Sequence, residues 1–146
     1  MRIVTAALVA AVVAASPACA QMMGDHMMKK SLYERLGGID AIRAVVDDFV
    51  ANVAADKRIN AFFAHTDIDR LKYSLVNQIC QGTGGPCTYT GRSMKDAHAG
   101  MGVRNRDFNA LVGDLGKTLK KFKVPKRETN ELVAILAPMR KDVVTR

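Results

Sequence analysis

The sequence predicts an all-α protein with a single domain. Four segments place apolar residues at helical spacing, and the clearest of these stripes is Ile42, Val45, Val46, Phe49, Val50 and Val53. No segment alternates apolar and polar residues as a strand of a half-buried sheet would. The 126 residues that follow a 20-residue leader (146 minus 20) suit one hydrophobic core.

The leader, residues 1–20, has the features of a secretory signal peptide. A charged start precedes an apolar run over residues 3–15 that is too short to span a bilayer. Ala18 and Ala20 then form the A-x-A pattern after which signal peptidase cuts, so the mature chain would begin at Gln21. We therefore expect an exported, periplasmic protein with no stable membrane insertion.

The alternative for the leader is a lipoprotein acylated at Cys19. Such a signal needs a leucine-like residue three positions earlier, and Ser16 stands there. After the leader we expect a disordered, Met-rich segment over residues 21–30 and a folded domain over residues 31–146.

The folded domain should open with a short helix over residues 31–36 and continue with three further helices after the Ile42 stripe. Thr66 or Asp67 could cap the first of the three. Each helix has one apolar face, so the helices must pack on one another around a shared interior. The three further stripes are Ile68, Leu71, Leu75 and Ile79; Phe108, Leu111, Val112, Leu115, Leu119 and Phe122; and Leu132, Ile135, Leu136, Met139 and Val143.

Three breaks interrupt the helical pattern. The Gly37-Gly38 pair permits a sharp turn before the Ile42 helix. Residues 82–91 are too rich in Gly and Pro for a helix, and a loop of this length usually has a function. We expect it to cross the domain and deliver residues 94–98 as a short helix on the far side. Pro138 should kink the last helix, because it lacks an N–H group.

The charge pattern favours a solvated surface. The formal net charge of +8 falls to +7 without Arg2, and a basic run occupies the end of one predicted helix. No aromatic-rich or other recognition motif accompanies the run, so we expect no nucleic-acid binding. Asp47 and Asp48 are predicted to be solvated charges on the outer face of their helix. The basic run consists of Lys117, Lys120, Lys121, Lys123, Lys126 and Arg127.

Cys80 and Cys87 are the cysteines that remain once the leader is removed. An even pair in an oxidising compartment is compatible with a disulfide, and two buried free thiols are the alternative. Their spacing is not a zinc pattern, and the chain has no C-x-x-C-H motif for covalent haem attachment. A thiol nucleophile paired with a histidine is disfavoured, because two cysteines able to form a disulfide are poorly suited to that role.

The three histidines differ in context. His26 lies in the Met-rich segment, which is either a disordered tail or a soft copper site. His65 follows two phenylalanines and fits a surface position, although it could also turn inward toward a metal. His98 ends a predicted helical turn among apolar neighbours and precedes two glycines. Its pattern alone is compatible with an ordinary core or surface histidine and with a metal ligand.

Five short motifs occur in order along the chain. They are Ser31-Leu32-Tyr33-Glu34-Arg35-Leu36-Gly37-Gly38, Ala61-Phe62-Phe63, Gly84-Gly85-Pro86, Tyr89-Thr90-Gly91, and Met94-Lys95-Asp96-Ala97-His98-Ala99-Gly100-Met101-Gly102-Val103. Each is weak alone, but their order and spacing together are specific. Through these motifs, residues 31–144 resemble the group I truncated haemoglobins, which implies a two-over-two helical sandwich.

The resemblance implies a haem b held without covalent bonds. His98 would be the proximal iron ligand, since a neutral imidazole binds iron well and its second nitrogen can be oriented by a backbone carbonyl. Phe63 would clamp the ring, and Lys72 would reach a propionate. Thr66 and Tyr89 are further candidates near the haem edge. Apolar residues that would line the haem, or simply pack in the core, are Phe49, Phe62, Leu71, Leu75, Met94, Met101, Val103, Phe108 and Leu111.

The distal side departs from many members of that family. Val50 and Leu75 replace a tyrosine and a glutamine that donate hydrogen bonds to the gas ligand, and Leu71 is aliphatic as well. The distal pocket should therefore be dry and poor in donors. Gln78, seven residues after Leu71, returns to nearly the same helix face and either points inward or is solvated. A donor to bound dioxygen is worth about 1.5–3 kcal/mol, so O2 should bind more weakly than in tyrosine-bearing relatives.

The resemblance implies a protein that reversibly binds O2 or NO, and also CO, as a carrier, scavenger or buffer. The alternative is an NO dioxygenase or a haem enzyme that reduces a nitrogen oxide or peroxide. That activity would need an external reductase, because the chain carries no flavin or nicotinamide motif. His65 could also occupy the sixth iron position and slow external ligands.

Overall fold

The computed structural model describes residues 29–146, and every regular element in this part of the chain is a helix. The predicted all-α fold is thus confirmed. The predicted signal peptide, with Cys19, lies outside the described residues. So does nearly all of the Met-rich segment, including His26. None of the helices within 29–146 has both the length and the apolar character needed to cross a bilayer. The helices are α2 (Leu32–Arg35), α3 (Gly38–Ala55), η1 (Asn60–Phe63), α4 (Ile68–Gly82), α5 (Met94–His98), α6 (Asn105–Lys121), α7 (Lys126–Leu136), η2 (Ala137–Met139) and α8 (Arg140–Val143).

The start of the domain is set by a capping box. Ser31 Oγ accepts a hydrogen bond from the Glu34 backbone N–H at 3.2 Å, and the Glu34 carboxylate accepts one from the Ser31 N–H at 2.7 Å. The helix α2 is therefore slightly shorter than the predicted 31–36. Gly37 and Gly38 follow with φ of 102° and 78°, values that an L side chain rarely adopts. The glycine pair makes the sharp turn into α3.

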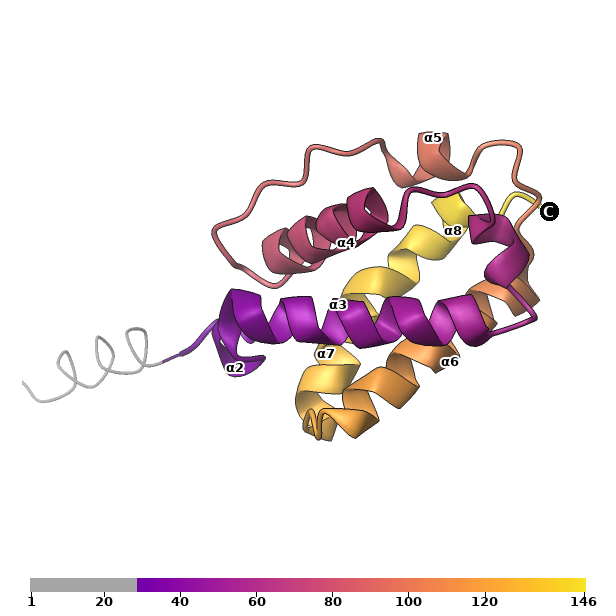
Figure 1. The fold of residues 1–146 in the computed structure, drawn as a ribbon. Coiled ribbons are helices and arrows are strands. Elements are labelled where there is room, and N and C mark those ends of the chain that lie inside the picture. The colour runs from indigo at the N-terminus through magenta and orange to yellow at the C-terminus, as the bar shows by residue number, and fades with distance from the viewer. Residues whose placement is uncertain (1–28) are drawn as a thin grey trace, which may run out of the picture.

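The four long apolar stripes form two packed layers. Helix α3 packs against α4 on one side and α6 on the other, while α7 and α8 pack against α6. Figure 1 shows α3 crossing the middle of the molecule, with α4 above it and α6 below. The buried side chains Val46, Leu119 and Leu132, each at most 1% exposed, come from three different helices. This arrangement is the two-over-two helical sandwich that the resemblance implied.

The ends of the later helices follow local chemistry. Asp67, rather than Thr66, caps α4, because its carboxylate accepts from the Arg70 N–H at 3.0 Å. Helix α4 continues to Gly82, one residue into the segment predicted to be a loop. Pro138 interrupts the last helix as expected: α7 ends at Leu136, and a 3₁₀ turn, η2, leads into α8.

The prediction for Asp48 was wrong, because its carboxylate lies in the α3–α6 interface. The side chain is 15% exposed and forms an ion pair with Lys121. Its Oδ2 accepts hydrogen bonds from Thr118 Oγ1 at 2.9 Å and from Asn52 Nδ2 at 3.3 Å. Lys121 and then Thr118 lower the pKa of Asp48 by stabilising the carboxylate. Helical periodicity predicted that Asp47 and Asp48 would both lie on the outer face of α3. Helix α6 covers Asp48 and leaves Asp47 exposed.

A second polar link joins the two ends of the domain. Arg35 on α2 donates to Glu128 Oε1 at 2.5 Å and to Glu131 Oε1 at 3.1 Å, both on α7. The guanidinium of Arg35 lowers the pKa of Glu131. The short opening helix is thereby anchored to the second layer.

Candidate functional site

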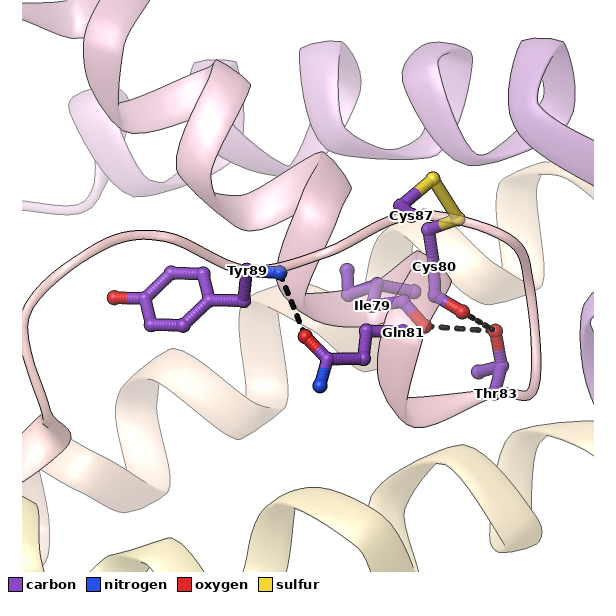
Figure 2. The surroundings of a disulfide bond; sticks show 6 residues. All are labelled: Ile79, Cys80, Gln81, Thr83, Cys87 and Tyr89. Atoms are coloured by element: carbon purple, nitrogen blue, oxygen red, sulfur yellow. Dashed lines mark hydrogen bonds between the residues drawn. A yellow bond between two sulfur atoms is a disulfide. The ribbon is translucent and has the colours of Figure 1, made fainter.

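The segment between α4 and α5 carries the chain back over α4. In Figure 1 it leaves the end of α4, turns and runs along that helix to α5. Cys80 in α4 and Cys87 in this segment form a disulfide, shown in Figure 2, with their Cα atoms 5.7 Å apart. Cys80 is fully buried and Cys87 is half-buried. The disulfide fixes the first part of the segment against the end of α4.

Close backbone packing adds to this attachment. A Cβ atom on Gly85 would lie 2.5 Å from Tyr33 Cδ2 and 2.7 Å from Cys80 Sγ, so only glycine fits there without a shift of its neighbours. The Gly85 N–H also donates to the Cys80 carbonyl at 2.8 Å. Gln81 Oε1 accepts from the Tyr89 N–H at 2.6 Å, which binds the next stretch to the same helix (Figure 2).

Helix α5 holds the histidine that the sequence singled out. Ser93 caps the helix by accepting from the Asp96 N–H at 3.1 Å, and the helix ends at His98. Helix α5 packs against α8. Beyond the helix, the Val103 carbonyl accepts from the Thr145 N–H at 2.9 Å, so the C-terminal segment supports the chain that follows His98.

The imidazole of His98 has one nitrogen committed to the backbone. His98 Nδ1 lies 2.8 Å from the Met94 carbonyl oxygen, one helical turn earlier. A carbonyl oxygen only accepts, so Nδ1 must carry the proton, and in the neutral imidazole Nε2 is left with a free electron pair. That tautomer presents Nε2 as a ligand for a metal.

An apolar pocket surrounds the His98 ring. Six of the residues predicted to hold the haem, Phe63 among them, border it with His98. Arg140 lies 4.4 Å from the centroid of the Phe108 ring and donates to Asn105 and Asn109, so one wall is held by α8. The six are Phe62, Phe63, Met101, Val103, Phe108 and Leu111.

Three further lining residues were not predicted. Ile59 lies between α3 and η1, Val143 in α8 and Asp107 in the first turn of α6. Val143 belonged to a recognised stripe, so its apolar character was a usable signal. Asp107 gave no sequence signal for a pocket residue. Its carboxylate accepts a hydrogen bond from the Arg104 N–H at 2.9 Å, as expected of an acidic residue in the first turn of a helix.

The residues predicted for the distal side lie on α3 and α4. Leu71 and Leu75 are half-buried, and Val50 from α3 is 5% exposed. Gln78 Nε2 donates toward Met94 Sδ at 3.7 Å and Met139 Sδ at 3.2 Å. The amide of Gln78 therefore points toward the other helices of the domain, which the sequence had left open.

The remaining predicted residues lie apart from the His98 pocket. Phe49 is buried in the core between the long helices. Lys72 pairs with Asp47 at 3.0 Å, and Thr66 is exposed. The Tyr89 hydroxyl donates to the Arg92 carbonyl at 2.7 Å, within its own loop (Figure 2 shows the ring turned away from the disulfide). His65 is exposed after η1.

The pocket suits a flat apolar metal cofactor with one imidazole ligand. The His98 ring offers a single oriented nitrogen, and apart from Asp107 the other lining residues are aromatic or aliphatic. One imidazole, oriented through its second nitrogen, is a common donor set for haem iron. The residues present therefore fit haem b.

Comparisons with known proteins point the same way. The sequence pattern of the family described as bacterial-like globin matches residues 31–145. The group 1 truncated haemoglobin GlbN of Mycolicibacterium paratuberculosis is 35% identical over 115 residues, covering 79% of this chain and 85% of that protein. The group 1 truncated haemoglobin of Tetrahymena pyriformis is 36% identical over 115 residues, covering 79% and 95%.

Solved structures agree with the sequence relatives. The Fe(III) form of the Tetrahymena pyriformis truncated haemoglobin superimposes with a TM-score of 0.77 at 35% identity, over 80% of this chain and 100% of that chain. The 2/2 haemoglobin of Synechococcus sp. PCC 7002, in the cyanomet state with covalently attached haem, gives 0.75 at 34% identity over the same shares. This chain belongs to the bacterial-like globin family, among the group 1 truncated haemoglobins, and its cofactor is haem b.

Proposed function

We propose that this protein reversibly binds O2 and NO, and also CO, as a carrier, scavenger or buffer of diatomic gases. In this proposal His98 Nε2 would be the proximal ligand of the iron of haem b, and the apolar residues that line the His98 pocket would hold the ring. The haem supplies an iron centre that binds such gases. What the chain supplies is the ligand nitrogen, the apolar enclosure and the polarity of the opposite side.

The observation that carries the proposal is the 2.8 Å contact between His98 Nδ1 and the Met94 carbonyl. This contact selects the tautomer with a free electron pair on Nε2 and fixes the plane of the ring. Phe62, Phe63 and Phe108 line the pocket that His98 borders, so an apolar ring would meet aromatic side chains there. An ordinary surface histidine would not be expected to have both an oriented ring and aromatic neighbours.

The decisive experiment removes the ligand nitrogen and then restores it. His98→Ala should lose the ferrous absorption spectrum of the parent, and added imidazole should restore it by occupying the vacated space. His65→Ala is the matched control and should keep the parent spectrum. An unchanged ferrous spectrum in His98→Ala would refute the assignment of His98.

On the opposite side we propose a pocket with few hydrogen-bond donors. Val50, Leu71 and Leu75 offer only aliphatic groups, so O2 lacks the donor from a tyrosine that other members of the family provide. Binding of CO depends less on such a donor, because CO is less polarised. The protein should therefore discriminate against O2 relative to CO more strongly than tyrosine-bearing relatives do.

We also propose that the chain is exported and cleaved before Gln21. The A-x-A pattern at Ala18 and Ala20 supports this, and so does the Cys80–Cys87 disulfide, because such bonds persist in oxidising compartments. Cell fractionation with mass measurement of the isolated chain tests it. A cytoplasmic chain that retains residues 1–20 would refute export.

A further inference from the structure

The turn between α6 and α7 gathers basic residues around an exposed aromatic ring. We name the basic turn by its members: Lys117, Lys120, Lys121, Phe122, Lys123, Lys126 and Arg127. All seven are exposed, and Phe122 retains 41% of its surface. Lys117, Lys121 and Arg127 pair with Asp114, Asp48 and Glu131. Among the described residues, Lys120, Lys123 and Lys126 form no ion pair, so their charges are available to a partner.

Lys123 occupies a backbone position that favours glycine. Its φ is 54°, and it is the one non-glycine residue with positive φ in residues 29–146. The Lys123 N–H donates to the Lys120 carbonyl at 3.0 Å and the Val124 N–H to the Leu119 carbonyl at 2.9 Å. This pattern is a Schellman motif with Lys123 at the left-handed position, where glycine avoids the steric penalty of a Cβ atom. Helix termination alone would favour glycine there.

The start of α7 shows a second conflict between charge and local stability. Lys126 and Arg127 are the first two residues of that helix. A helix N-terminus carries a partial positive charge, so cations at these positions are unfavourable. Three basic residues of the turn thus stand where folding disfavours them, which points to a role in binding.

The mixture of unpaired lysines and a phenylalanine fits an anionic lipid surface. Clusters of basic residues bind acidic headgroups, and an exposed aromatic side chain enters the boundary between headgroups and acyl chains. An acidic redox protein is a poorer match, because the basic turn lies at the opposite end of the molecule from α5, which carries His98 (Figure 1). Electrons delivered there would start far from the cofactor.

We propose that the basic turn binds the surface of an anionic bilayer, with Phe122 inserted among the headgroups and the α4–α5 side facing away from the membrane. The interaction is peripheral and reversible. It places the gas-binding pocket toward the aqueous phase, so membrane attachment and ligand entry do not compete. The surface is independent of the proposed gas ligand.

The test is sedimentation of haem-loaded protein with lipid vesicles. The chain should begin at Gln21, because the apolar residues 3–15 would bind lipid by themselves. The match to each of the two solved relatives takes in 80% of this chain and 100% of that relative. We therefore expect the chain that begins at Gln21 to fold. Vesicles of phosphatidylcholine with about a third phosphatidylglycerol should bind the protein, and pure phosphatidylcholine should not. Raising salt to about 0.5 M should release it, because screening shortens the reach of the charges.

Variants separate the basic turn from general electrostatics. Lys120→Ala and Lys123→Ala together should weaken partitioning about 25-fold, at roughly fivefold per lysine. Phe122→Ser should weaken it about fivefold through lost apolar contact. Lys95→Ala, on exposed α5 at the other end of the molecule, is the matched control and should bind as the parent does.

Lys123→Gly distinguishes binding from folding. It should raise the unfolding temperature, because glycine relieves the left-handed position, while vesicle binding falls about fivefold. Equal binding to neutral vesicles would overturn the proposal. Loss of binding in Lys95→Ala equal to that in the turn variants would overturn it as well, as would binding to acidic polypeptides such as polyglutamate but not to vesicles.

Discussion

Gln78 on α4 and Met94 on α5 contact each other across the domain, with Gln78 Nε2 3.7 Å from Met94 Sδ. Met94 is also the residue whose carbonyl orients His98. The two helices that bracket the proposed haem site are therefore linked through the residue that sets the imidazole.

The first prediction concerns Gln78. If its amide reaches the gas ligand, Gln78→Leu should release O2 about 10-fold faster, because a charge-assisted hydrogen bond is lost. CO release should change by less than twofold. Tyr73→Leu, at an exposed residue of the same helix, serves as the control. Stopped-flow dissociation measures all three, and unchanged O2 release in Gln78→Leu would show that the distal side has no donor at position 78.

The second prediction concerns Val50. Val50→Tyr should slow O2 dissociation about 10- to 100-fold by placing a phenolic donor where the family often has one. Val50 is 5% exposed, so a larger side chain also crowds the core. Val50→Phe matches that crowding without the hydroxyl and should release O2 as the parent does. O2 release from the parent that is as slow as from Val50→Tyr would contradict the weak-binding proposal.

The third prediction concerns the disulfide. Cys80→Ser with Cys87→Ser should lower the free energy of unfolding by about 2–3 kcal/mol, since a short covalent loop no longer restricts the unfolded chain. Urea denaturation of the parent with and without dithiothreitol should reproduce the difference. The double variant should be insensitive to the reductant, and an equal effect of reductant on both proteins would show that the bond is not its target.

A fourth prediction uses two glycines. Gly85→Ala should lower stability by about 1–3 kcal/mol, because its Cβ atom would overlap Tyr33 and Cys80. Gly113→Ala, in α6, meets no atom within 4 Å and should raise stability by about 0.5–1 kcal/mol through helix propensity. Thermal unfolding compares the two. A stabilised Gly85→Ala would mean that the segment after α4 packs differently.

The fifth prediction concerns how stability depends on pH through two carboxyl groups, the half-buried Asp48 and the buried Asp114, whose pKa values shift in opposite directions. Lys121 lowers the pKa of Asp48 below 3.8, so its stabilising contribution is present above that pH and is lost as the pH falls through the lowered value. Burial raises the pKa of Asp114, so ionisation of Asp114 destabilises the fold as the pH rises above 3.8. Its Oδ2 is the one buried side-chain oxygen without a hydrogen-bond partner among the described residues.

Substitutions should separate these two effects. Asp48→Asn should lower the unfolding temperature at pH 7, and this effect should shrink as the pH falls below 3.8. Asp114→Asn should raise it at pH 7 and converge with the parent in acid. Differential scanning calorimetry across pH 3–7 provides the measurement. An Asp114→Asn protein that is less stable than the parent at pH 7 would show that the Asp114 charge is compensated.

The sequence by itself determined which segments are helical and which residue is the principal candidate ligand. Apolar spacing identified the four long helices, and the glycine pair and Pro138 marked their breaks, because these signals act within a few residues. His98 was distinguished by a family resemblance in the motifs around it. Its local pattern alone favoured an ordinary core or surface histidine.

Only the tertiary structure decided what lies opposite each helix face. Asp48 and Asp47 are neighbours in sequence, yet α6 covers one and leaves the other exposed, 64% for Asp47. From the sequence alone, Gln78 could have faced water, and only the structure shows Met94 and Met139 beside its amide. Likewise Cys80 could have been a free thiol, and only the fold of the following loop brings Cys87 to it. Helical periodicity reports the direction of a side chain from its own axis, whereas burial and partners depend on segments far away in the chain.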